Sequence, residues 1–265
     1  MFNLTLYKRE IKSSWKMLLV FTVVLTLYVS MIIGMYDPEM SKMLDEFADM
    51  MPEIMAAMGM ASGASTLLGF MISYLYGFIV LMFPMLYSIL RSNSLVAKYV
   101  DRGSMVSLVT APVKRRTVAV TQMKALLTGI ILLVIYTTVI ELICATQFPG
   151  ELDVSALLLV NAGLLCLHFF IGGICFLASC LFSDTKYSIG FGAGVPVLMF
   201  VLKMLSNAGK EAEAIKFVTF FSLFNPEKLA TFDGTAIAGI LVLFTGSIAL
   251  FVAAIVVFSK KDLHI

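Results

Sequence analysis

The stretch that decides the fold is "VKRRTVAVTQMKALLTGIILLVIYTTVIELICA", residues 113–145, in which a cluster of basic residues precedes a long apolar run. The hydrocarbon core of a bilayer is about 30 Å thick, and a helix needs roughly 20 apolar residues to cross it. The run from about 118 to 145 meets that length. We therefore predict a transmembrane helix here, preceded by a loop that stays outside the hydrocarbon because burying its charges is costly.

Similar apolar runs recur along the whole chain of 265 residues. Apolar residues make up 60% of the sequence and charged residues only 14%, whereas about a quarter of a soluble domain is charged. We predict an all-α, polytopic integral membrane protein that forms a single transmembrane domain. Its six predicted spans cover approximately residues 17–36, 63–90, 118–145, 154–182, 187–205 and 236–258. A net charge of +2 gives no reason to expect a nucleic-acid partner.

The distribution of basic residues predicts the orientation of the chain, because cytosolic loops are enriched in Lys and Arg. With both termini in the cytosol, 14 of the 19 basic residues fall on the cytosolic side. Six acidic residues crowd the first outer loop: Asp37, Glu39, Asp45, Glu46, Asp49 and Glu53. We expect a multi-pass protein of a plasma membrane of bacterial type.

Three segments outside the spans have distinct expectations. Residues 1–16 predict a short interfacial amphipathic helix, retained because a full-length span and no cleavage site follow it. The extracytoplasmic segment 37–62 has seven methionines between 40 and 60; thioethers suit Cu(I), but an amphipathic helix on the outer rim is the favoured interpretation. The extracytoplasmic segment 206–235 predicts a short helix or re-entrant hairpin at the outer interface.

Few residues within the spans suggest chemistry. Glu141 and Lys203 lie near the outer ends of spans three and five, where long side chains reach the interface. His168 lies deep in span four without a second histidine or a carboxylate nearby in sequence, which favours a packing role. No metal-binding or catalytic motif is visible, and the chain has no nucleotide-binding motif of its own. We therefore expect neither an enzyme nor a cofactor in this chain, and we interpret its four cysteines as apolar thiols.

Proline and glycine mark two spans. Pro84 follows Gly77 in span two and predicts a kink or a local break there. Span five contains "GFGAGVP", in which Gly190, Gly192 and Gly194 predict close packing of helices.

The cytosolic loop 91–117 is the longest inner connection. Leu95, Val96 and Tyr99 share one helical face, and Ser104 is placed to cap a second short helix that ends at Pro112. This pattern predicts an amphipathic elbow along the inner membrane surface that can enter a groove on a partner. A solvated basic loop held by anionic lipid is the alternative.

The segment "DRGSMVSLVTAPVKRRTVAVTQMK", residues 101–124, resembles the connection between the second and third spans of ABC-2-type transporter permeases. The likeness rests on a Gly-Ser pair, apolar positions, a Pro-Val-Lys-Arg-like run and a later lysine. The matching positions are Gly103, Ser104, Met105, Leu108, Pro112, Val113, Arg115 and Lys124. The ending "FSKKDLHI" is also similar to the family's C-terminus. Relatives often carry Glu shortly before the glycine, where this chain has Lys98 and Asp101.

The resemblance implies a type V exporter-like permease fold whose elbow acts as a coupling helix seated in a cytosolic ABC ATPase. The implied docking residues are Lys98, Tyr99, Asp101, Arg102, Gly103, Ser104, Met105, Leu108, Pro112 and Arg115. It further implies a second permease copy, ATP and Mg²⁺ bound by the ATPase, and export of an amphipathic or hydrophobic substrate such as a peptide, lipid or drug. Spans two and five would flank the path, giving Pro84, Gly190, Gly192 and Gly194 a mechanical role.

Two other classes of function remain open at this point. A secondary transporter or channel without an ATPase would depend on a buried group such as Glu141 or His168. A membrane scaffold or an intramembrane enzyme would tolerate replacement of residues 98–116 by a neutral linker.

Overall fold

The computed structural model describes residues 2–37, 50–57, 66–101, 103, 105, 113–147, 151–207 and 210–261. Every regular element within these ranges is helical. In chain order they are α1 (Leu4–Gly34), α3 (Pro52–Ala57), α4 (Leu67–Met71), the π-helix η1 (Ile72–Tyr76), α5 (Ile79–Leu95), α6 (Ala97–Asp101), α8 (Arg115–Ala145), α9 (Val154–Leu181), α10 (Thr185–Asn207), the 3₁₀ helices η2 (Lys210–Phe217) and η3 (Phe220–Leu223), α11 (Pro226–Ala230) and α12 (Gly234–Lys260).

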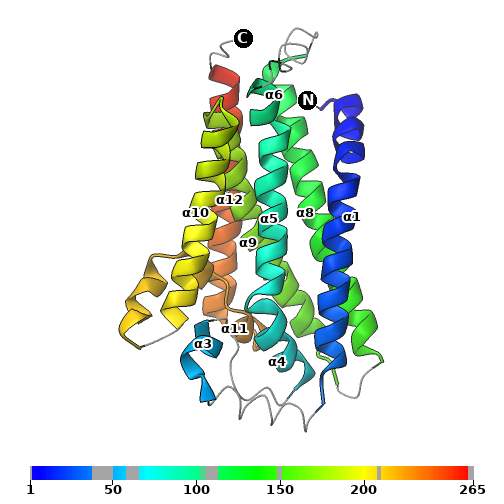
Figure 1. Ribbon diagram of the computed structural model, residues 1–265, viewed down its shortest axis with the longest axis vertical. Helices are drawn as coiled ribbons and strands as arrows, with labels where there is room; N and C mark the ends of the chain where they lie inside the picture. Colours follow the sequence, from blue (N-terminus) through cyan, green and yellow to red (C-terminus); the bar gives the residue numbers. More distant parts are fainter. Residues whose placement is uncertain are drawn as a thin grey trace.

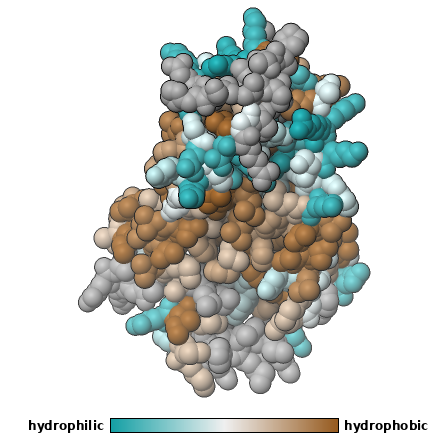
Figure 2. Space-filling model, turned by 45° about the horizontal axis from the view of Figure 1, so that its top comes forward, coloured by the Kyte–Doolittle hydropathy of each residue, from teal (hydrophilic) through white to brown (hydrophobic). Residues whose placement is uncertain are grey.

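Six of the described helices are long and apolar enough to cross a membrane, which confirms the predicted number of spans. They are α1, α5 with α6, α8, α9, α10 and α12. In Figure 1 they form a bundle in which the start of α1 and the end of α12 lie at the same end as α6. We call this the α6 end, and the opposite end, where α3, α4 and α11 lie, the α11 end. Figure 2, with the α6 end brought forward, shows hydrophilic side chains gathered there above a hydrophobic surface.

Helix α1 differs from the expected separate interfacial helix over 1–16. It is one continuous helix of 31 residues in which the amphipathic start and the first span run together. Asn3 caps it by accepting a hydrogen bond from the Leu6 amide at 3.0 Å. No glycine or proline interrupts the sequence from Leu4 to Ile33, so nothing in the backbone favours a bend.

The second predicted span is broken, but not at its proline. The chain passes from α4 through η1 and then leaves helical geometry at Phe78, where φ is −138° and ψ is −58°. Pro84 lies inside the α-helix α5, six residues further on. The predicted break therefore falls next to Gly77, and a π-helix, a rare element that is frequent at functional sites, precedes it.

Helix α9 forms the centre of the bundle, packed against α5, α8, α10 and α12. Many side chains of α9 are buried, and its glycines allow the neighbouring helices to approach closely. A Cβ added at Gly163 would lie 2.7 Å from a Leu229 methyl group, and one at Gly173 would lie 2.9 Å from Leu250. Apart from α9 and α5, much of the surface of the long helices is apolar and exposed, as lipid-facing helices require.

Short helices cover the α11 end. The 206–235 segment contains η2, η3 and α11, and Phe221 of η3 is fully buried against Phe200 of α10, with ring centroids 5.5 Å apart. The predicted breaker Asn225-Pro226 starts α11, with Asn225 as its N-cap. In the methionine-rich segment the structure describes α3, which begins at Pro52 and buries Met55; Met40, Met43, Met58 and Met60 lie outside the described residues.

Candidate functional site

The α6 end contains the described part of the predicted elbow. Helix α5 ends at Leu95, the chain turns at Val96, and α6 begins at Ala97. All three residues are buried, so the apolar face of the elbow is packed against the bundle. The polar residues that follow on α6 are consequently held at the surface of this end.

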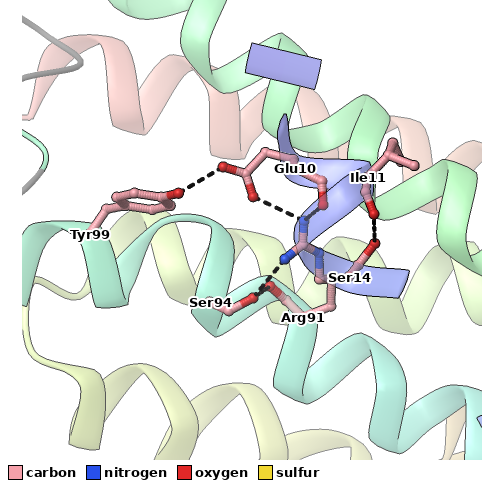
Figure 3. A network of polar contacts seen from close by, with 6 residues as sticks. All are labelled: Glu10, Ile11, Ser14, Arg91, Ser94 and Tyr99. Atoms are coloured by element: carbon pink, nitrogen blue, oxygen red, sulfur yellow. Dashed lines mark hydrogen bonds and ion pairs between the residues drawn. The ribbon is translucent and has the colours of Figure 1, made fainter. Parts of the chain in front are cut away.

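A buried polar network joins this elbow to α1 (Figure 3). Arg91 Nη2 donates to the Glu10 carboxylate at 2.9 Å and to the Glu10 backbone carbonyl at 2.7 Å. On the other side of the same carboxylate, the Tyr99 hydroxyl donates at 2.8 Å. Arg91 Nη1 donates to Ser94 Oγ at 3.2 Å, and the Arg9 guanidinium lies 5.9 Å from the centre of the Tyr99 ring. Glu10 thus holds α1, α5 and α6 together.

Burial makes this network sensitive to the loss of any member. Arg91 and Glu10 have side chains only 4% and 1% exposed. Removing one partner of such a pair leaves an uncompensated charge and costs about 3–5 kcal/mol. Arg91 Nε has no partner within the described structure, so one buried donor of the guanidinium remains unsatisfied.

The predicted docking residues are found in different surroundings. Lys98 and Asp101 are exposed, whereas Tyr99 turns toward Glu10 and Met105 is buried. Gly103 has a φ of 67°, a backbone conformation in which glycine is unstrained. Arg115 donates to the Lys261 carbonyl at 2.9 Å and so ties the start of α8 to the end of α12. Four further residues of this set lie outside the described residues: Arg102, Ser104, Leu108 and Pro112.

Pro84 and His168 form one unit rather than two separate features. Proline has no amide hydrogen, so the Val80 carbonyl one turn earlier in α5 has no intrahelical donor. His168 Nε2 of α9 lies 3.0 Å from that oxygen. A carbonyl can only accept, so Nε2 carries the proton, and Nδ1 is buried without a partner. His168 therefore has a specific backbone partner on α5, while its second ring nitrogen has no partner within the described structure.

Glu141 lies in a second buried network, near the α11 end. The Tyr76 hydroxyl, at the end of η1, is 3.0 Å and 3.1 Å from the two carboxylate oxygens. Asn161 Nδ2 of α9 donates to Glu141 Oε2 at 2.8 Å, and Asn161 Oδ1 is buried without a partner. Glu141 is fully buried between helices and does not reach the interface, so the expected snorkelling is wrong.

The glycines of α10 differ from one another. Gly192 packs against α9: its carbonyl accepts from Cys175 Sγ at 3.2 Å, and an added Cβ would lie 3.5 Å from Ala178 Cβ. Gly190 and Gly194 have open space where a Cβ would be. Within this structure, close packing therefore holds for Gly192 and not for its two neighbours.

Sequence reasoning missed Glu10, Tyr76 and Asn161 as members of buried networks. Glu10 carries a signal that was available, since it is the only acidic residue before Asp37 and stands among four basic residues. The predicted loop 91–117 begins at Arg91, but in the structure Arg91 lies inside α5 and its guanidinium binds Glu10 of α1. Tyr76 and Asn161 have no such signal, because only the packing of α9 beside η1 and α8 brings them to Glu141.

No family model matches the chain, and comparisons with curated proteins and with solved structures found no match either.

Proposed function

We propose that this protein is the permease subunit of an ATP-driven ABC transporter that exports an amphipathic or hydrophobic substrate. In this proposal the chain belongs to the ABC-2 type, works as a dimer of permeases in a bacterial plasma membrane, and has both termini in the cytosol. A separate ATPase binds ATP and Mg²⁺ and docks on the elbow at the α6 end. The sequence resemblance over residues 101–124 motivates the proposal.

The observation that carries the proposal is the connection of the elbow to two membrane spans. Tyr99 lies on α6, two residues before Asp101, and its hydroxyl is bonded to Glu10 of α1, which also binds Arg91 of α5. A partner that pushes on the exposed face of α6 would therefore move α1 and α5 together. A loop that only rested on lipid would need no such buried connection.

The first test is purification of the tagged chain in mild detergent from its native cells, followed by identification of retained proteins and measurement of ATP hydrolysis. We expect an ABC ATPase to be retained by the unmodified chain. Charge reversal of the exposed residues, Lys98→Glu with Asp101→Lys, should release it.

Tyr99→Phe is the matched variant, because it removes the hydroxyl that binds Glu10 and leaves the exposed charges in place. It should retain the ATPase but reduce the stimulation of ATP hydrolysis by the permease. If no ATPase accompanies the unmodified chain, the proposal loses its energy source and fails.

The Glu141 network favours a second candidate, an ion-coupled transporter. Ionisable groups inside a bilayer commonly mark ion or proton pathways. Glu141 is placed beside a π-helix and a helix break, where backbone groups can rearrange. In reconstituted vesicles without any ATPase, a proton or sodium gradient would then drive uptake of substrate that Glu141→Gln abolishes, whereas the ABC proposal expects no gradient-driven transport.

A further inference from the structure

A groove lies between the first turns of α1 and the α5–α6 elbow. It has a volume of about 370 Å³. Its lining comes from one face of α1, at spacings of three and four residues, and from the facing side of α5 and α6: Glu10, Ser13, Ser14, Met17, Leu90, Arg91, Ser94, Lys98 and Tyr99. The groove contains the network of Figure 3 but is larger than that network, and nothing in the permease mechanism above uses its remaining space.

The groove changes from polar to apolar along the bundle. At 1.5 Å per residue, Met17 lies about 10 Å further from the α6 end than Glu10 does. Leu90 lies similarly deep on α5 relative to Lys98. Glu10, Lys98 and Tyr99 therefore line the part nearest the α6 end, and Met17 with the half-exposed Leu90 lines the deep part. Arg91 follows Leu90 in sequence and reaches Glu10 with its side chain. An occupant of matching polarity has a charged head and an apolar tail.

The charges of the groove favour an anionic head. Arg91 and Lys98 face a single carboxylate, and that carboxylate already accepts hydrogen bonds from Arg91 and Tyr99. Lys98 is exposed and has no acidic partner among the described residues. Arg91 is 3% exposed, yet its Nε–H has no acceptor. Buried donors of this kind are normally satisfied, so Arg91 retains one donor without an acceptor beside the groove.

We propose that this groove binds a phosphate group, supplied by an anionic phospholipid of the surrounding leaflet. Arg and Lys pair strongly with phosphate oxygens, and the hydroxyl group of the exposed Ser13 adds a neutral donor. The acyl chains would follow Met17 and Leu90 into the hydrocarbon. Free phosphate is the other source of the same chemistry. The inference does not depend on an ATPase, so its success or failure is separate from that of the proposed transport function.

Trp15 provides the reporter. It is the only tryptophan in the chain, it is 53% exposed, and it lies in the same turn of α1 as Ser13 and Ser14, which line the groove, within a helix diameter of about 10 Å. The purified full-length chain is reconstituted into vesicles of phosphatidylcholine with a minor fraction of phosphatidylglycerol. In separate samples, the acyl chains of either phosphatidylglycerol or phosphatidylcholine carry bromine, which quenches the fluorescence of Trp15. The ratio of the quenching by brominated phosphatidylglycerol to that by brominated phosphatidylcholine gives the preference for the anionic lipid.

Lys98→Gln removes a charge that lines the groove. Its control is Lys12→Gln, which removes one exposed positive charge from the part of α1 beside the groove but not from the groove lining. We expect Lys98→Gln to reduce the preference for phosphatidylglycerol about fivefold, and Lys12→Gln to reduce it less than about twofold. Inorganic phosphate, added at constant ionic strength, distinguishes the sources: displacement of phosphatidylglycerol shows that free phosphate suffices, and no displacement shows that the lipid is required. Equal losses in the two variants, or no preference in the unmodified chain, would overturn the proposal.

Discussion

The contact between His168 and the Val80 carbonyl predicts that a proline on one helix and a histidine on another are energetically coupled. Val80 lacks its intrahelical donor only because residue 84 is proline. Pro84→Ala restores an amide hydrogen at that position, and the Val80 carbonyl can then be satisfied within α5. In that background the hydrogen bond from His168 Nε2, 3.0 Å long, becomes dispensable.

The magnitude follows from the groups that lose their partners. A buried carbonyl left without a donor costs about 1–3 kcal/mol, while hydrogen bonds between membrane helices contribute on average about 0.6 and at most about 1.7 kcal/mol. His168→Leu also removes the unpartnered Nδ1, which offsets part of the loss. The cost of His168→Leu alone is therefore a poor measure of the hydrogen bond to the Val80 carbonyl. We expect instead that His168→Leu costs about 1 kcal/mol less in the Pro84→Ala background than in the unmodified chain.

The assay is a double-mutant cycle of reversible unfolding in mixed micelles, titrated with SDS and followed by circular dichroism. Thr245→Val serves as the control, because Thr245 is exposed on α12 and bonds only to its own helix at Leu241 and Val242. Its cost should be the same in both backgrounds. A coupling between Pro84 and His168 below about 0.3 kcal/mol would refute the reasoning, since independent sites add to within that amount.

Three further predictions use the same unfolding measurement. Glu10→Gln should destabilise the protein by about 3 kcal/mol because Arg91 loses its carboxylate, and adding Arg91→Met should recover most of that; no recovery would contradict the pairing. Gly239→Ala should cost about 2 kcal/mol, since its Cβ would collide with the Leu223 carbonyl oxygen, whereas Gly194→Ala, facing open space, should be neutral or stabilising. Hydrogen bonds from Ser155 and from the Ala156 amide hold the pKa of the N-cap carboxyl Asp153 below its usual range. Hydrogen bonds from Thr235 do the same for the pKa of the N-cap carboxyl Asp233. Their contribution is present above the unfolded-state pKa and is lost as pH falls through the lower folded-state pKa, so the double Asp→Asn variant should flatten the fall in the free energy of unfolding as the pH drops from about 5 to about 3.

The number of spans and the approximate limits of most of them could be predicted because they depend on local properties of the chain. The second span is the exception: the prediction is 63–90, whereas the structure has Ile79–Asp101. A run such as 154–182 must be helical in lipid, since each backbone amide and carbonyl needs a partner and only a helix supplies it within the segment. The structure places α9 at Val154–Leu181, within one residue of that prediction. The helix start at Pro226 follows in the same way from a residue with restricted backbone freedom. The break in the second span does not, because Gly77 has ordinary helical angles and the chain leaves helical geometry at Phe78.

The partners of the buried polar groups could not be predicted, because they join residues far apart in the chain. Glu10 and Arg91 are separated by 81 positions, and Tyr76 and Glu141 by 65. Sequence spacing shows which residues share a face of one helix, but not which face of another helix lies opposite. That choice depends on the packing of side chains around α9, and it turned Glu141 inward when its position near a helix end suggested an exposed group. The sequence by itself therefore determined that this chain is a bundle of six apolar helices, through the cost of unpaired backbone groups in lipid. Only the tertiary structure decided where its few charges meet.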